Sequence, residues 1–177
     1  QIPLREGLTW ENGDPLNADT VIYSYKMLSD PKLLNSRASY FSSNTITVLN
    51  GTEYTAGECE WEDVGLKKID DYTVELTTAA PVTANEIMIH LCFNCSMAMV
   101  HEPTYEAAMN EDRSATMYGT SADTYMSAGS FTIKEWIPGA SITYQKNPDW
   151  VFADKIWLAE VTERVVTDTS TTLQMFL

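Results

Sequence analysis

Four side chains of the types that can bind metal ions or, for the cysteines, exchange disulfides lie within one short stretch of the sequence. Cys92 and Cys95 form a C-x-x-C pair, and His90 and His101 lie on either side of it. Two thiolates and two imidazoles can hold Zn²⁺ tetrahedrally, and a C-x-x-C pair can exchange with disulfides when the pKa of one thiol is lowered. A metal-binding or thiol-redox module is therefore one alternative for this chain.

The residues around the two cysteines favour packing over chemistry. Residues 87–100 are rich in Ile, Met, Leu, Phe and Val, which is typical of a core helix or strand. A buried cysteine often behaves as a small apolar side chain. Cys59, the third cysteine, leaves a structural disulfide open, although an odd count is weak evidence for a disulfide framework. We therefore predict no metal site and no cofactor, and keep zinc, redox and disulfide roles as alternatives.

The usual patterns of catalytic residues are missing from the sequence. It contains no G-x-S-x-G motif and no glycine-rich phosphate-binding loop, and only two histidines could act as a base. The carboxylates are numerous but scattered, so no glycosidase-like pair can be selected. We predict that the protein is not an enzyme.

Composition limits the possible partners. The 177 residues carry 25 Asp and Glu against 11 Lys and Arg, a net charge of −14, which argues against nucleic acid. Solubility is the simplest explanation of this acidity, and a preference for cationic ligands is the alternative. No apolar run is long enough to span a membrane, and the 44% of hydrophobic residues suffice for a packed core.

Periodicity and turn residues predict short helices and strands that would position these side chains. Asn17 should cap the first helix, Asn85 a second, and Asp168 or Ser170 the last. Helices are expected over residues 18–30, 86–93 and 102–113, and from 168 or 170 onward. Strands are expected over residues 4–10 and 155–166, and hairpins over 64–80 and 131–144. Residues 35–62 read as loops around one short apolar helix or turn at 46–49.

Four blocks of the sequence, in this order, resemble a known family. They are LREGLTWENGDPLNADTVIYSYKMLSDP, VGLKKIDDYTVELTTAAPV, SAGSFTIKEWIPGASITYQKNPDW and VVTDTSTTLQMFL. Together they are similar to the extracellular solute-binding proteins of family 5, which serve peptide and nickel ABC importers. The stretch DPKLLNSRASYF further resembles the oligopeptide-binding branch. The third block departs from the family's G-T-G-P-Y, because it keeps only Gly129 and the aromatic Phe131; Gly129 is expected to supply an unusual φ.

The resemblance implies a fold and a domain organisation. It implies an α+β fold, with a small mixed or antiparallel sheet, β-hairpins and packed helices, as part of the first lobe of a two-lobed periplasmic-binding-protein type II-like fold. Residues 1–177 would be an internal fragment of that lobe. Residues 1–126 would form the peripheral subdomain, and residues 127–177 would form the hairpin, strand and helix that return to the main lobe.

The resemblance also implies a function. The parent protein would be the substrate-binding component of an ABC importer, capturing peptides, most readily oligopeptides, outside the cytoplasmic membrane and delivering them to the permease. It would be lipid-anchored in the periplasm or at the cell surface, with no other membrane contact and no nucleic acid partner. The fragment alone would bind peptide weakly or not at all. A nickel, dipeptide or sugar-oligomer binder on the same scaffold is the alternative within this class.

One residue is expected near the ligand on the strength of the resemblance. In the oligopeptide branch, an aromatic residue just before the Ala-Ser-Tyr lies near the ligand, and Arg37 holds that place here. A guanidinium in the cleft could pair with a ligand carboxylate. The alternative is a solvated arginine in a surface loop. Arg37 is therefore the predicted ligand-binding residue of this chain.

Overall fold

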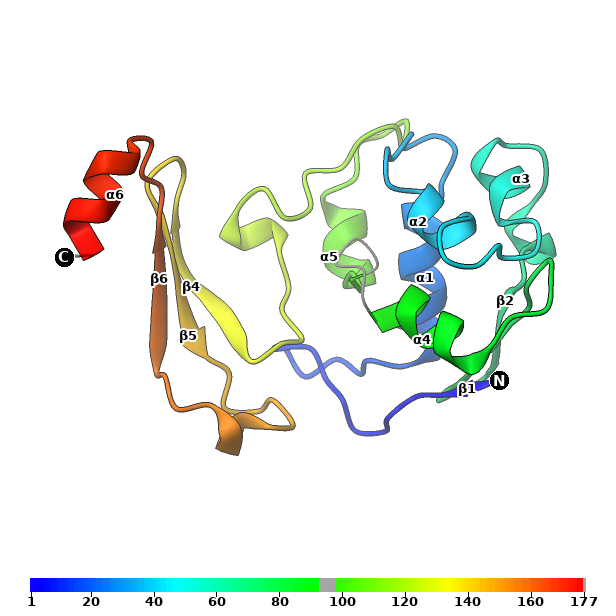
Figure 1. The fold of residues 1–177 in the computed structure, drawn as a ribbon, viewed down its shortest axis with the longest axis horizontal. Coiled ribbons are helices and arrows are strands. Elements are labelled where there is room, and N and C mark those ends of the chain that lie inside the picture. Colours follow the sequence, from blue (N-terminus) through cyan, green and yellow to red (C-terminus); the bar gives the residue numbers. More distant parts are fainter. Residues whose placement is uncertain (93–97, 177) are drawn as a thin grey trace.

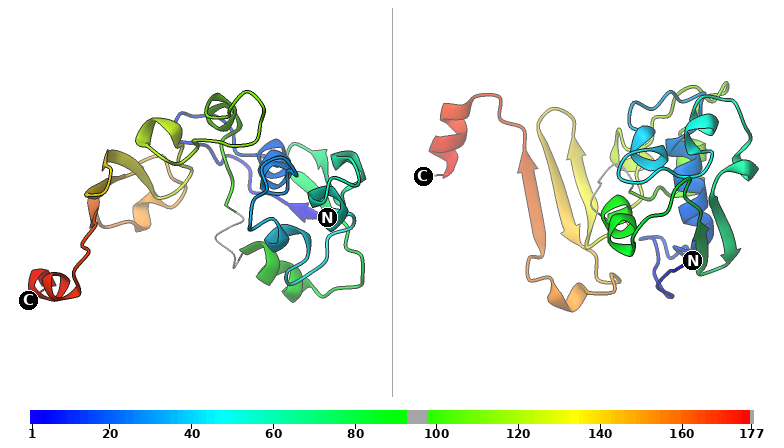
Figure 2. Two further views of the ribbon diagram at one scale, coloured as in Figure 1. Left: turned by 90° about the horizontal axis from the view of Figure 1, so that it is seen from above. Right: turned by 45° about the vertical axis from the view of Figure 1, so that its right-hand side comes forward.

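The computed structural model describes residues 1–92 and 98–176, and it forms two parts of unequal packing. Figures 1 and 2 show helices α1–α5 gathered around a small sheet at one end, with a second sheet and α6 at the other. Both sheets are antiparallel, so the expectation of an α+β fold with antiparallel hairpins is confirmed. The helices are α1 (Ala18–Leu28), α2 (Ser39–Ser42), α3 (Gly51–Thr55), α4 (Ala84–Cys92), α5 (Glu102–Ala107) and α6 (Thr169–Phe176).

Each sheet has three strands and is built on one of the predicted hairpins. In the first, β1 (Ile2–Pro3) and β2 (Leu66–Asp70) flank β3 (Thr73–Leu76). In the second, the order is β4-β5-β6, so that β6 lies at an edge. The second sheet consists of β4 (Phe131–Ile137), β5 (Ser141–Lys146) and β6 (Glu160–Arg164).

Helix α1 begins where the sequence predicts it. The Asn17 side chain accepts hydrogen bonds from the backbone N–H groups of Asp19 (3.0 Å) and Thr20 (3.3 Å). The Thr20 hydroxyl accepts the Asn17 N–H in return, which completes a capping box. Val21 and Tyr25 lie one turn apart on the buried face of the helix. This cap and this stripe fix both the start of α1 and the face that it packs on the core.

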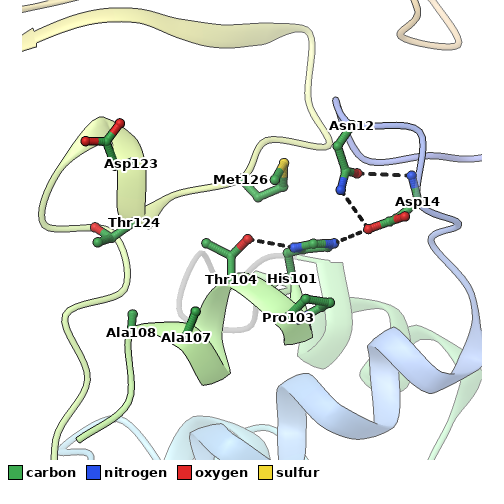
Figure 3. Close-up of a pocket in the computed structure, with 10 residues that line it drawn as sticks. All are labelled: Asn12, Asp14, His101, Pro103, Thr104, Ala107, Ala108, Asp123, Thr124 and Met126. Carbon is green, nitrogen blue, oxygen red and sulfur yellow. Dashed lines mark hydrogen bonds and ion pairs between the residues drawn. The ribbon is translucent and has the colours of Figure 1, made fainter.

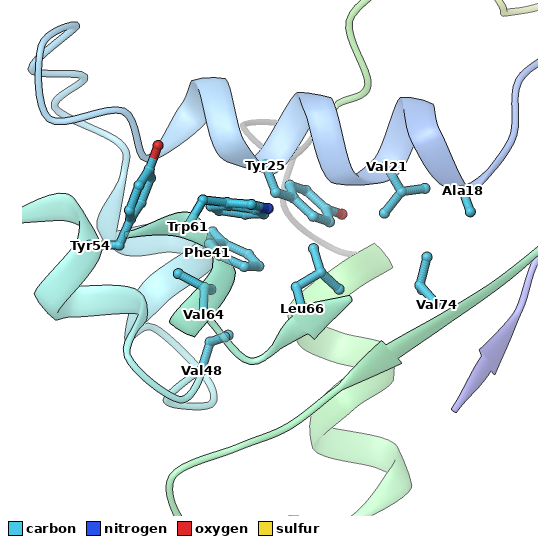
Figure 4. Close-up of a cluster of buried hydrophobic side chains, with 10 residues drawn as sticks. All are labelled: Ala18, Val21, Tyr25, Phe41, Val48, Tyr54, Trp61, Val64, Leu66 and Val74. Carbon is cyan, nitrogen blue, oxygen red and sulfur yellow. The ribbon is translucent and has the colours of Figure 1, made fainter. Parts of the chain in front are cut away.

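The core lies between α1, the first sheet and the segment of residues 38–64 that carries α2 and α3, as Figure 4 shows. Phe41 is fully buried, and its ring stacks on Tyr25 with centroids 4.9 Å apart. Trp61 continues the row, 6.3 Å from Phe41 and 5.1 Å from Tyr54. Aromatic side chains contribute large buried areas, so this row supplies much of the hydrophobic stabilisation of the N-terminal part.

Two segments before the first hairpin differ from the expected regular elements. Residues 4–10 form turns rather than a strand, because Gly7 takes a φ of 76° and only Thr9 pairs, in an isolated bridge to Pro15. Residues 46–49, predicted as a short helix or turn, form no helix: Val48 bridges Thr78, and the chain turns at Leu49. Burial alternates there with the period of a strand, and two short helices, α2 and α3, lie on either side instead.

Several predicted boundaries shift for local reasons. Thr83, not Asn85, caps α4: its hydroxyl accepts the Glu86 N–H at 3.3 Å, and Glu86 accepts the Thr83 N–H at 2.7 Å. Helix α5 ends at Ala107 rather than at Arg113, and Met109 already pairs with Thr116 in an isolated bridge. Strand β6 begins only at residue 160, because a 3₁₀ turn occupies residues 153–155. The cap of α6 is Asp168, whose carboxylate accepts the Thr171 N–H at 2.8 Å, as predicted.

The C-terminal part contributes little to the core. Every buried apolar side chain among the described residues lies between Trp10 and Tyr105. All five residues of β6 are exposed, and Trp157 is 96% exposed. In the described ranges, no helix combines the length and apolar character needed to cross a bilayer. The second sheet therefore presents surfaces that the 177 residues do not cover.

Candidate functional site

A groove of about 400 Å³ opens where the two parts of the molecule meet. Three segments far apart in the sequence form it: the turn at residues 12–14, the start of α5, and residues 123–126, as Figure 3 shows. The groove is lined by Asn12, Asp14, His101, Pro103, Thr104, Ala107, Ala108, Asp123, Thr124 and Met126. The groove brings polar side chains from all three segments together.

A hydrogen-bonded chain of side chains forms one wall of the groove. His101 Nε2 lies 2.8 Å from Asp14 Oδ2, and His101 Nδ1 lies 2.8 Å from Thr104 Oγ1. A neutral ring protonated at Nε2 satisfies both contacts, because Nε2–H donates to the carboxylate and the Thr104 hydroxyl donates to Nδ1. The His101 side chain is only 5% exposed. Trp10 packs its ring against the imidazole at 5.3 Å, which fixes the plane of the ring.

Asp14 carries the charge in this hydrogen-bonded network of side chains. It accepts a second hydrogen bond from Asn12 Nδ2 at 2.7 Å. The hydrogen bonds from Asn12 and then from His101 hold the pKa of Asp14 below its ordinary value, so the carboxylate is ionised at neutral pH. Half of the Asp14 side chain remains exposed and faces the groove. The wall therefore offers a fixed negative charge to a bound molecule.

The order Asp14–His101–Thr104 also matches the connectivity of a hydrolase triad, in which a histidine activates a hydroxyl. Here the same contacts join the turn at residues 12–14 to the first turn of α5. The sequence patterns considered above single out neither Asp14 nor Thr104. The signal available was the H-x-x-T spacing, which places Thr104 one helical turn after His101.

The turn at residues 127–131, which leads into β4, is stabilised by side-chain hydrogen bonds rather than by an unusual backbone conformation. The Ser127 hydroxyl donates to the Phe131 carbonyl at 2.6 Å, and its backbone N–H donates to Glu11 Oε1 at 2.9 Å. Asn147 Nδ2 donates to the Gly129 carbonyl at 3.0 Å. Gly129 has no positive φ, so the expected unusual φ at this glycine is wrong. Hydrogen bonds from Ser127 and Asn147 stabilise the turn instead.

Arg37, the predicted ligand-binding residue, is exposed in a turn before α2. Its backbone N–H donates to Asn35 Oδ1 at 3.0 Å. It does not belong to the lining of the groove at residues 12–14. A role in binding ligand remains a prediction for this residue.

The structure separates the side chains that a metal site or a redox pair would need. His90 Nε2 donates to the Phe41 carbonyl at 3.0 Å inside the core, whereas His101 bonds Asp14 and Thr104. Cys92 is an exposed free thiol, and Cys95 lies outside the described residues. In residues 1–92 and 98–176, no three His, Cys, Asp or Glu side chains are arranged to hold a metal ion.

The disulfide alternative for Cys59 is not found. Cys59 is a free thiol whose Sγ lies 3.7 Å from the Asn50 carbonyl. Burial, and then the carboxylates of Asp63 and Glu53, raise the pKa of this thiol. A thiol held protonated in this way is a poor nucleophile, so Cys59 behaves as a packing residue.

The described residues thus combine an α+β fold, a polar groove and sheet surfaces that they leave exposed. The model of the bacterial extracellular solute-binding proteins, family 5, matches residues 1–177. The chain belongs to this family. Membership of this family favours the hypothesis of an oligopeptide-binding protein over that of a metal-binding or redox module.

Individual relatives give the scale of the match. The chain is 30% identical to the dipeptide-binding protein DppE of Bacillus subtilis over 98% of its own length and 29% of that protein. It is 27% identical to the periplasmic oligopeptide-binding protein OppA of Salmonella typhimurium, over 90% of this chain and 27% of that one. The structure of Listeria monocytogenes OppA bound to peptide matches with a TM-score of 0.82 and 28% identity, over 99% of this chain and 32% of that one. The chain thus spans about 30% of the length of these relatives.

Proposed function

We propose that this chain is part of the substrate-binding component of an ABC importer, which captures peptides, and oligopeptides in particular, and delivers them to the permease. The observation that carries the proposal is the family match over residues 1–177, together with 28% identity to a structure bound to peptide. Peptide capture in such a protein needs no bond-making: two lobes close on the ligand about a hinge, and the closed form is presented.

The proposed place of the chain is inside the first lobe, with residues 1–126 as its peripheral subdomain and residues 127–177 as the return to the main lobe. The uneven burial supports this division. The N-terminal part has its own aromatic core, whereas β6 and Trp157 are exposed and need further protein to cover them. Other segments of the first lobe would pack on these surfaces.

Binding of ligand would involve the groove at residues 12–14 and the loop that carries Arg37. A guanidinium pairs well with a peptide carboxylate, and Arg37 is exposed on the surface of this chain. Tight binding requires the second lobe, so the isolated chain is expected to bind peptide weakly or not at all. The parent protein would act in the periplasm or at the cell surface, held by a lipid anchor.

Calorimetric titration with peptides of two to six residues tests this proposal on the longer protein and on the 177-residue chain. We expect saturable binding of peptide by the longer protein and none by the chain alone. Tight binding by the isolated chain would contradict the two-lobe scheme. A strict preference for peptides of two residues would favour the dipeptide alternative, which the name of the B. subtilis relative supports.

The proposal includes the absence of catalysis, and the Asp14–His101–Thr104 chain gives that part a direct test. An activated Thr104 would hydrolyse an activated ester such as p-nitrophenyl acetate faster than its T104V variant. We expect equal, background rates for both proteins. A rate that depends on the Thr104 hydroxyl would show that the groove is an active site.

A further inference from the structure

The groove at residues 12–14 has walls that are held together by contacts within this chain. The His101 side chain joins α5 to Asp14, and the His101 backbone N–H donates to Tyr118 Oη at 3.3 Å. Tyr118 Oη donates in turn to the Met126 carbonyl at 3.5 Å, so the opposite wall is tied to the same histidine. The volume of about 400 Å³ falls within the ~300–1,000 Å³ that is usual for sites of small ligands.

Only one oxygen of the Asp14 carboxylate is engaged by the protein. Oδ2 accepts hydrogen bonds from Asn12 Nδ2 at 2.7 Å and from His101 Nε2 at 2.8 Å. Oδ1 has no hydrogen-bond partner in the described part of the chain, and half of the side chain is exposed. A guanidinium binds a carboxylate most strongly through both oxygens, whereas an ammonium needs only one. Asp14 therefore suits an ammonium group better than a guanidinium group.

The surroundings of Asp14 favour a positively charged ligand group. Asp14 lines the groove and also a second hollow of about 310 Å³, and no described residue that lines either hollow is a lysine or an arginine. Asp123 adds a carboxylate to the groove. Glu102 and Asp19, the latter paired with Lys68, add two to the second hollow. Hollows lined by one sign of charge concentrate ions of the opposite sign, and the net charge of −14 acts in the same direction.

The rest of the groove suits an aliphatic stem. Four apolar side chains line the same opening as Asp14, as Figure 3 shows: Pro103, Ala107, Ala108 and Met126. A lysine side chain carries its ammonium on four methylenes, which pack on apolar surface while the charged end reaches a polar partner. The α-ammonium at the N-terminus of a peptide has no such stem. Apolar lining beside a single carboxylate therefore fits a lysine side chain better than a peptide N-terminus.

We propose that the groove binds the side chain of a lysine in the captured peptide, with the ammonium on Asp14 Oδ1 and the methylenes along Pro103 and Met126. The inference rests on the proposed function, because the lysine belongs to a peptide ligand. His101 does not cancel the charge of Asp14, since the neutral ring satisfies both of its contacts. The groove thus selects among peptides by one side chain and leaves the peptide backbone to other parts of the protein.

Paired peptides test the inference on the longer protein. Norleucine has the stem of lysine without the ammonium, so tetra-alanine peptides that carry either residue at each position in turn measure the contribution of the charge. Calorimetric titration should show that lysine binds at least about tenfold more tightly than norleucine at one position. The ratio should fall as salt is added, because salt screens a partly exposed ion pair. A ratio near one at every position would overturn the proposal.

Two further peptides separate the sources of positive charge. Arginine at the selected position should bind more weakly than lysine, because Asp14 offers only one free oxygen, and equal affinity would contradict the assignment of an ammonium. Acetylation of the peptide N-terminus should leave the ratio of lysine to norleucine unchanged. A ratio that disappears on acetylation would assign the groove to the α-ammonium and overturn the lysine proposal.

A variant of Asp14 assigns the preference to this groove. D14N keeps an oxygen for His101 Nε2–H but removes the charge, so it should bring the ratio of lysine to norleucine close to one. D112N makes the same charge change at a carboxylate that accepts a hydrogen bond from Ser114 and lines neither hollow, and it should keep the ratio. A preference for lysine that survives D14N, or that D112N also removes, would overturn the assignment.

The outcomes separate this inference from the proposed function. If the longer protein binds the lysine and norleucine peptides equally, peptide capture stands and the lysine proposal fails. If it binds none of the peptides, both fail.

Discussion

At the scale of single residues, His101 and His90 show how the same side chain serves two different environments. His101 lies at the groove and has partners on both ring nitrogens, Asp14 and Thr104. His90 lies in the core with one partner, the Phe41 carbonyl, and its Nδ1 is buried without a hydrogen bond. The sequence presented both residues as possible zinc ligands, because spacing alone does not report which way a ring points. In the structure, His101 belongs to the wall of the groove and His90 to the core.

Removing the Thr104 hydroxyl should destabilise the groove wall. T104V keeps the shape of the side chain but leaves His101 Nδ1 buried without a donor, which costs about 1–3 kcal/mol. T104S keeps the hydroxyl and should lose much less, so it is the matched control. Urea unfolding measures the free energy of unfolding of each variant. Equal stability of T104V and the original protein would mean that the imidazole does not depend on this contact.

His90 should make the stability of the fold depend on pH. Burial lowers the pKa of His90 below its ordinary value of 6.5, so the unfolded chain binds a proton more readily than the folded one. Stability is then unaffected above pH 6.5 and falls as the pH is lowered below it, by up to about 1.4 kcal/mol per pH unit.

A variant isolates this contribution of His90. H90Q keeps a donor for the Phe41 carbonyl but does not titrate, so its stability should change less between pH 7 and pH 5.5. Urea unfolding at the two pH values gives the comparison. If both proteins lose the same stability over this interval, His90 is not the group responsible.

At the scale of elements, the sequence predicts best where a cap and a period agree. Helix α1 has Asn17 at its cap and an apolar stripe behind it, and the two hairpins have alternating strands joined by turn residues. Helix α4 shows the limit. Thr83 and Asn85 are both good capping residues two positions apart, and the choice depends on Glu86, which can return a hydrogen bond only to the residue three positions before it.

Substitution of the two candidate caps tests that choice. T83A removes the side-chain acceptor of the Glu86 N–H and should lower the free energy of unfolding by about 1 kcal/mol. N85A changes a residue inside the first turn and should have an effect of less than about 0.5 kcal/mol. Thermal unfolding followed by circular dichroism ranks the two variants. A larger loss for N85A than for T83A would restore the original prediction.

At the scale of the whole molecule, the groove follows from contacts that no sequence pattern reports. The groove joins residues 12–14 to residues 101–104, and their pairing depends on how α5 packs after a segment of about ninety residues. The strand at residues 2–3 was likewise missed, because two residues are too few for an alternating pattern and its place depends on β3. Local signals predicted most helices and both hairpins, while long-range contacts decide the site.

Uneven burial predicts that the two parts of the molecule open separately. Amides of α1, β2 and β3 lie against a core that includes Val64 and Val74, both almost fully buried, so they should exchange with solvent only on global unfolding. Strands β4–β6 lack such a core and should exchange at least about tenfold faster, through local opening. Hydrogen exchange followed residue by residue measures both sets. V64A should speed exchange in α1, β2 and β3, because a cavity in the core lowers the free energy of global unfolding, and should leave β4–β6 unchanged. Equal acceleration in both parts would show that the chain unfolds as one cooperative unit.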